Sequence, residues 1–141
     1  MGPTCRGKAS RSDSGGLLGD TPVLCDVPPI ADAGLICRRL ADGRAAANVP
    51  HIVRYHSPTG FEWGYGGSGP AELAMNAMAA LLRPDGTHMD RVYGDCVVSN
   101  DAARLHQDFK WVFIAPMPYA GGIVRIEDIN EWIARKLAHI T

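Results

Sequence analysis

The stretch FEWGYGGSGPAELAMNAMAALL, residues 61–82, joins a segment rich in glycine and aromatic residues directly to a helical pattern. Proline fits the first position of a helix, where its missing N–H has no partner inside the helix. Pro70 therefore predicts a helix start, with Ser68 or Gly69 as its cap. Behind it, apolar side chains recur at helical spacing at Leu73, Ala77 and Leu81. The run Pro84–Gly86 predicts where this helix ends.

The glycine and aromatic loop, Phe61–Pro70, has two open interpretations. It can be a rigid corner, in which three aromatic side chains share one buried face and the glycines allow a tight turn. It can also be a ligand cradle, because successive backbone N–H groups at a helix N-terminus attract anions and aromatic rings stack planar groups. The motif matches neither the dinucleotide fingerprint nor the P-loop. The candidate ligand-binding residues are Phe61, Trp63, Tyr65, Gly66, Gly67, Ser68 and Gly69.

Two side chains are candidate catalytic residues, His56 in the segment before the loop and Glu62 within the loop. His51–His56 alternates in a way that favours a half-buried strand, and Ser57–Gly60 is typical of a turn. Across that turn His56 and Glu62 could pair as acid and base, or the pair could simply lock the turn. Glu62 could instead be a solvent-facing carboxylate, whereas Glu72 is expected to complement the helix dipole.

The rest of the chain predicts short strands and helices that do not alternate regularly. Strands are expected at 23–27, at 91–99 with a break at Gly94-Asp95, at 110–115 and at 123–126. Helical segments are expected at 33–40, at 101–109 behind an Asn100 cap, and at 127–138. Trp111 and Trp132 are expected in the core. This pattern predicts an α+β fold, a small and mainly antiparallel sheet packed against two or three helices.

A flexible N-terminal arm is expected at residues 1–22, which mix basic residues with serine and glycine, followed by a single domain at 23–141. The arm could order on a partner or on another copy of the chain. The balance of 14 basic and 15 acidic residues gives a net charge of -1. Such a balance lacks the basic face typical of nucleic-acid binding, and no apolar run is long enough to suggest a membrane span.

The cysteines and histidines do not predict a metal or cofactor site. The four cysteines, Cys5, Cys25, Cys37 and Cys96, include no CxxC pair, and no secretory signal precedes them. Free thiols in a cytoplasm are therefore expected, with Cys96 as a small buried residue. Along a strand His51 and His56 would point to opposite faces, which makes them poor ligands of one metal. The remaining histidines, His88, His106 and His139, are expected at the surface.

The run HSPTGFEWGYGGSGPAELA, residues 56–74, resembles the signature of the DUF6166 family of small uncharacterised proteins. The resemblance extends over roughly residues 50–138, including the segment with Pro116 and Pro118 and the stretch that ends at Trp132. It implies an origin in bacteriophages or other mobile elements and an intracellular setting. It brings no known reaction with it.

Three hypotheses about function follow from these features. In the first, the loop makes the chain a binding module for a small anionic or planar ligand or for a host protein. In the second, the chain is a structural phage protein or an inhibitor of host defence, and the loop is only a corner of the fold. In the third, it is an enzyme acting on a nucleotide-type substrate with His56 and Glu62 as acid and base. We favour the binding module, since no complete catalytic constellation accompanies the loop.

Overall fold

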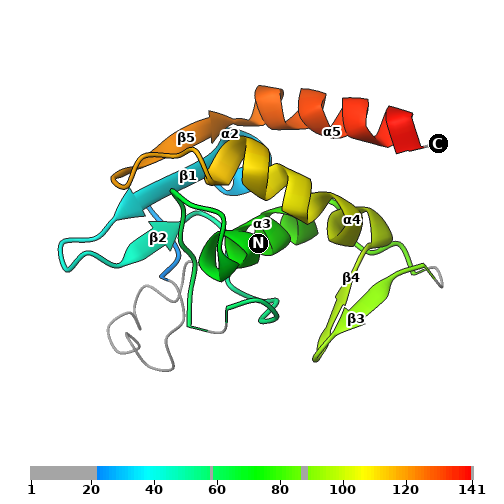
Figure 1. Ribbon diagram of the computed structural model, residues 1–141, viewed down its shortest axis with the longest axis horizontal. Helices are drawn as coiled ribbons and strands as arrows, with labels where there is room; N and C mark the ends of the chain where they lie inside the picture. Colours follow the sequence, from blue (N-terminus) through cyan, green and yellow to red (C-terminus); the bar gives the residue numbers. More distant parts are fainter. Residues whose placement is uncertain (1–21, 58, 87–88, 141) are drawn as a thin grey trace.

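The computed structural model describes residues 22–57, 59–86 and 89–140 (Figure 1). Its helical elements are α2 (Ile30–Ala33), α3 (Ser68–Leu81), α4 (Asn100–Phe109), the π-helix η3 (Lys110–Ile114) and α5 (Ile126–Ile140). Its strands are β1 (Gly34–Arg39), β2 (Ala45–Ala47), β3 (Arg91–Tyr93), β4 (Cys96–Val98) and β5 (Gly121–Arg125). The predicted α+β class is confirmed. The arm predicted at 1–22 lies, except for Pro22, outside the described residues.

The larger sheet has three antiparallel strands in the order β2-β1-β5. The β1–β5 pairing begins and ends on a glycine with positive φ, Gly34 at 93° and Gly121 at 108°. A Cβ on either glycine would collide with the backbone of the opposite strand, at Val124 for Gly34 and at Cys37 for Gly121. These two positions therefore allow the strands to approach at both ends of the ladder. A second, two-stranded sheet is the β3–β4 hairpin.

Helix α3 forms the centre of the core. Every residue from Gly69 to Met78 is buried, which is the pattern of a helix covered on all sides. It packs against α2, α4 and η3, and Figure 1 shows α3 and α4 between the three-stranded sheet and the β3–β4 hairpin. Helix α5 follows β5 directly and contacts β1 and α2. The glycine and aromatic loop therefore leads straight into the most buried element of the fold.

Two predictions in the first third of the chain are wrong. The helical turns expected at 33–40 are the central strand β1, with α2 ending just before it at Ala33. Gly34 ends that short helix with positive φ, and the apolar run Leu35–Cys37 is buried within the sheet. The strand expected at 23–27 is reduced to an isolated bridge from Val23 to Ala47.

The strand predicted at 110–115 is also wrong, because the chain continues from α4 into η3. The backbone N–H of Ala115 donates to Lys110 O at 2.8 Å, the i to i−5 bond of a π-helix. This wider turn keeps both Phe109 and Ile114 fully buried, five positions apart. Burial of these two side chains outweighs the β propensity of the segment. One consequence is that Trp111, expected in the core, is 59% exposed.

Helices α3 and α4 begin close to the predicted residues, but their N-cap residues differ from the predicted ones. Helix α3 begins two residues before Pro70, and its cap is Gly67, which makes no side-chain cap bond. Helix α4 is capped by Ser99 rather than Asn100, since Ser99 Oγ accepts from the N–H of Ala102 at 3.0 Å. The break at Gly94-Asp95 is confirmed as the turn of the hairpin, and the final strand and helix are confirmed as β5 and α5.

Candidate functional site

The glycine and aromatic loop turns at Gly64, so its three aromatic side chains do not share one face. Phe61 and Trp63 are buried, each 2% exposed, whereas Tyr65 is 52% exposed. Gly64 adopts a φ of 91° and donates its N–H to Ile114 O at 3.1 Å. A left-handed residue interrupts the alternation of an extended segment. The aromatic face predicted for the loop is therefore wrong at Tyr65, which points outward.

The glycines that follow leave room for the protein's own aromatic rings. A Cβ on Gly66 would collide with the ring of Trp111, and one on Gly67 would lie 2.5 Å from Tyr65 Cε2. At Gly69 it would lie 2.8 Å from Glu62 Cβ. The backbone is thus approached closely, as the glycine content predicts, and the approaching groups are side chains of the same chain. Glycine is needed here because rings lie directly on the backbone.

Lys110 links the π-helix η3 to this loop. Its side chain is buried, its Nζ donates to Gly66 O at 3.0 Å, and the same Nζ lies 4.3 Å from the centre of the Trp111 ring. A cation over an aromatic face holds the ring in place. Trp111 and Tyr65 consequently lie over consecutive backbone positions, Gly66 and Gly67, while more than half of each side chain remains exposed. We call these two side chains the aromatic surface.

Glu62 does not pair with His56, so the predicted acid–base pair is not formed. Arg39 holds the Glu62 carboxylate with both ends of its guanidinium, at 3.0 and 2.7 Å. The guanidinium also lies 4.5 Å from the Trp63 ring centre and 3.9 Å from that of Tyr119, and its Nε donates to Tyr119 O. Bidentate pairing and stacking of this kind fix orientation. Glu62 therefore ties the loop to β1 and to the turn after η3.

Glu72 is the buried carboxylate that the sequence did not reveal. It was expected to complement the helix dipole, yet its side chain is 0% exposed. It accepts from His51 Nε2 at 2.7 Å, from the His56 N–H at 2.7 Å and from the Tyr55 N–H at 3.1 Å. Burial alone raises the pKa of Glu72, but the hydrogen bonds from His51 and from the backbone bring it below its ordinary value. The carboxylate is therefore ionised at neutral pH.

The segment 51–56 is predicted as a strand but joins no sheet in the structure. Most of its backbone partners are side chains of α3. Asn76 Oδ1 accepts from the N–H groups of Ile52 and Val53, and Asn76 Nδ2 donates to Val53 O. Together with Glu72, these bonds replace a strand ladder, which explains why the backbone groups of a partly buried loop are satisfied. Helix α3 thus holds the backbone of residues 51–56, which precede the glycine and aromatic loop.

His56 pairs with His106 rather than with Glu62, their Nε2 atoms being 2.9 Å apart. His106, expected at the surface, is 6% exposed, and its Nδ1 lies 2.7 Å from Ala103 O. Burial and the nearby Lys110 ammonium lower the pKa of both histidines. Both rings are then neutral at neutral pH. In that state His106 donates from Nδ1 to the Ala103 carbonyl and accepts at Nε2 from His56.

Cys37 and Cys96 are free thiols. Cys37 is buried in β1, and burial raises the pKa of its thiol to about 12. Cys96 is half-buried rather than fully buried and donates its S–H to Ile52 O at 3.3 Å. No helix in the described ranges is long and apolar enough to cross a lipid bilayer.

The fold and this site define a small α+β domain whose central helix begins beneath an exposed aromatic surface. Residues 32–100 match the model of a family of unknown function, DUF6166. This match supports the family resemblance of the sequence. The match starts earlier than the resemblance at 50–138 and takes in β1 and β2, and it ends at the first residue of α4. No curated protein and no solved structure matches the chain.

Proposed function

We propose that this chain is an accessory binding protein and that the aromatic surface, Tyr65 and Trp111, is where its partner binds. The observation that carries the proposal is the exposure of two large aromatic side chains, 52% and 59%, over a rigid glycine backbone. Tryptophan and tyrosine dominate the binding energy of protein interfaces. A ring held by Lys110 and Gly66 is already ordered, so little side-chain entropy is lost when a partner packs on it.

The nature of the partner follows from what already covers the start of α3. The Glu62 side chain lies against Gly69, and the Tyr65 ring lies over Gly67. A carboxylate-bearing side chain and a ring in these places favour a partner that packs on aromatic faces over a small anion held by the helix amides. The π-helix adds support, since single π turns frequently occur at functional sites. We infer a partner protein, and in the phage-type setting this would be a host protein.

The proposal includes the cellular compartment in which the protein acts, the host cytoplasm. Free thiols in the described part of the chain fit a reducing compartment such as the host cytoplasm. The alternative enzyme hypothesis loses its motivation, because His56 pairs with His106 and Glu62 pairs with Arg39. The structural or defence-inhibiting hypothesis differs from ours in one testable respect. It needs only the fold at the loop, whereas a binding module needs the exposed rings themselves.

The experiment compares affinity capture from a host lysate by the wild-type chain, by Trp111→Ala and by Tyr65→Ala. The control is Ile123→Ala, which removes a comparably exposed apolar side chain, 66% exposed, from β5. Partners that bind the aromatic surface are retained by the wild type and by the control and are lost with both ring variants. A set of captured proteins that is the same for all four chains would contradict the proposal. Melting temperatures show that each variant is folded.

A further inference from the structure

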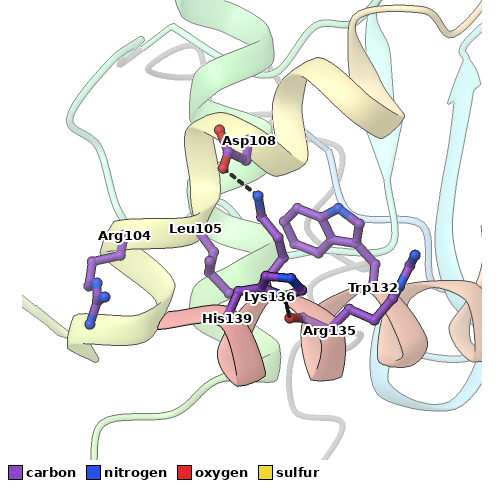
Figure 2. Close-up of a pocket in the computed structure, with 7 residues that line it drawn as sticks. All are labelled: Arg104, Leu105, Asp108, Trp132, Arg135, Lys136 and His139. Carbon is purple, nitrogen blue, oxygen red and sulfur yellow. Dashed lines mark hydrogen bonds and ion pairs between the residues drawn. The ribbon is translucent and has the colours of Figure 1, made fainter. Parts of the chain in front are cut away.

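A groove between α4 and α5 lies apart from the aromatic surface and has a different chemical character. Its cavity volume is about 590 Å³. The floor is formed by Leu105 and Trp132, which are 2% and 7% exposed. Polar and charged side chains complete the lining, namely Arg104, Asp108, Arg135, Lys136 and His139. Figure 2 shows Arg104 and Arg135 on opposite sides of the central Lys136–Asp108 pair.

The charges of the two arginines of this groove are not compensated by acidic side chains of the described residues. Five basic side chains in the described part have an acidic partner: Arg38 with Asp26, Arg39 with Glu62, Arg44 with Asp42, Arg125 with Asp128, and Lys136 with Asp108. Arg104 and Arg135 have no acidic partner among the described residues, and both line the same groove. The chain as a whole has a net charge of -1. The groove is therefore a local concentration of positive charge on a protein that is otherwise nearly balanced.

We propose that this groove binds a small ligand carrying two or more phosphate groups. A volume of about 590 Å³ lies in the range of sites for small molecules and cofactors. The guanidinium fork matches phosphate oxygens in two-point contacts. Arg104 and Arg135 flank the groove from different helices, so a ligand with several phosphate groups can contact both.

A small ligand fits this charge distribution better than a nucleic acid does. Binding along a phosphate backbone needs a basic stripe that follows the strand over several contacts. Here the uncompensated charge is confined to two arginines around one cavity. The N-terminal residues 1–21 are a poor occupant as well, because their sequence contains Arg6, Lys8 and Arg11 against Asp13 and Asp20. A segment with net positive charge is repelled by a basic groove.

Asp108 places a carboxylate in the groove, and its partner explains why an anion is still attracted. Lys136 Nζ lies 2.8 Å from Asp108 Oδ2, so the two charges compensate each other. The two arginines then determine the net charge that a ligand meets. It follows that Asp108→Asn releases a third cation, Lys136, to the ligand. This substitution should strengthen phosphate binding by about tenfold, the effect of one additional charged contact.

The experiment is a calorimetric titration of the full chain with tripolyphosphate and with ATP, with adenosine as the uncharged comparison. The test variant is Arg104→Gln/Arg135→Gln, and both of its positions are exposed. The matched control is Arg38→Gln/Arg44→Gln, which removes the same number of exposed cations from the β1–β2 region. We expect binding of tripolyphosphate and ATP but not of adenosine. We expect a weakening of about a hundredfold in the test variant and little change in the control.

Several results would overturn the proposal. One is the failure of the wild type to bind either phosphate ligand at millimolar concentration, and another is binding of adenosine that is as tight as that of ATP. An equal loss in the control variant would show that general charge, not the groove, attracts phosphate. A single-stranded oligonucleotide that binds far more tightly than tripolyphosphate, and loses this in the test variant, would assign the groove to nucleic acid instead. Trp111→Ala should leave tripolyphosphate binding unchanged, which separates this site from the aromatic surface.

Discussion

Replacing Glu72 with glutamine should destabilise the protein strongly while changing its shape very little. The buried carboxylate accepts from His51 Nε2 and from the N–H groups of Tyr55 and His56. Glutamine keeps one oxygen for the backbone but presents an N–H₂ group to His51. A hydrogen bond to a charged group contributes about 1.5–3 kcal/mol and one between neutral groups about 0.5–1.5 kcal/mol. Weakening three bonds and mispairing one of them gives an expected loss of about 3 kcal/mol in the free energy of unfolding.

The loss at Glu72 is measured by urea unfolding followed by circular dichroism. Glu131→Gln is the matched control, because Glu131 is an exposed carboxylate on α5 and its loss should change stability by less than about 0.5 kcal/mol. A double-mutant cycle with His51→Gln should show a coupling of about 0.5–3 kcal/mol. If Glu72→Gln costs no more than the Glu131 control, the carboxylate does not organise residues 51–57 and the reasoning is refuted.

Three further predictions concern other parts of the framework. Ser99→Ala removes the α4 cap and should lower the free energy of unfolding by about 1 kcal/mol in denaturant titrations, and an unchanged midpoint would contradict this. Arg39→Lys loses both the two-point contact to Glu62 and the stacked guanidinium. Chemical denaturation should therefore show a free energy of unfolding that is lower by about 2 kcal/mol, whereas Glu62→Gln should lower it by about 1 kcal/mol. The lowered pKa values of His56 and His106 mean that the unfolded chain binds more protons as the pH falls through the ordinary histidine value of 6.5. Melting temperatures should therefore fall from about pH 7.5 to about pH 5.5, and His106→Gln should flatten this dependence; an identical slope in the variant would exclude the histidine pair as its source.

The sequence predicted the parts of the fold whose signals are local. Pro70 marks the first turn of α3, and Gly94-Asp95 marks the turn of the β3–β4 hairpin. The apolar stripe of Ile129 and Ile133 indicates helix α5, in which both side chains are buried. In each case a residue type with a strong conformational preference, or a helical repeat of apolar residues, coincides with the structure that tertiary packing favours.

The sequence could not predict features that depend on partners far along the chain. Arg39 and Glu62 are 23 residues apart, and Glu72 and His51 are 21 apart, so no local spacing announces either pair. The segment Lys110–Ile114 has β propensity and becomes a π-helix because Phe109 and Ile114 are both buried. That change is also what exposes Trp111. Propensity alone therefore predicts a core position for Trp111, the main residue of the proposed interface.

The glycine content of the loop has a different physical cause from a bound ligand. Four glycines, Gly64, Gly66, Gly67 and Gly69, indicate that something approaches the backbone closely. Rings of Tyr65 and Trp111 and the Glu62 side chain are what approach three of them. The composition could show the close approach but not its source, because Trp111 lies more than 40 residues further along the chain. The glycines therefore support an ordered aromatic surface as well as a corner.

The most direct test of the aromatic surface is the affinity of one captured partner for the wild-type chain and for Trp111→Ala, measured by surface plasmon resonance. A central tryptophan of an interface contributes about 2 kcal/mol or more, so the variant should bind roughly 30-fold more weakly or worse. Ile123→Ala should bind as the wild type does. An unchanged dissociation constant for a folded Trp111→Ala chain would contradict the proposal that this surface is the binding site.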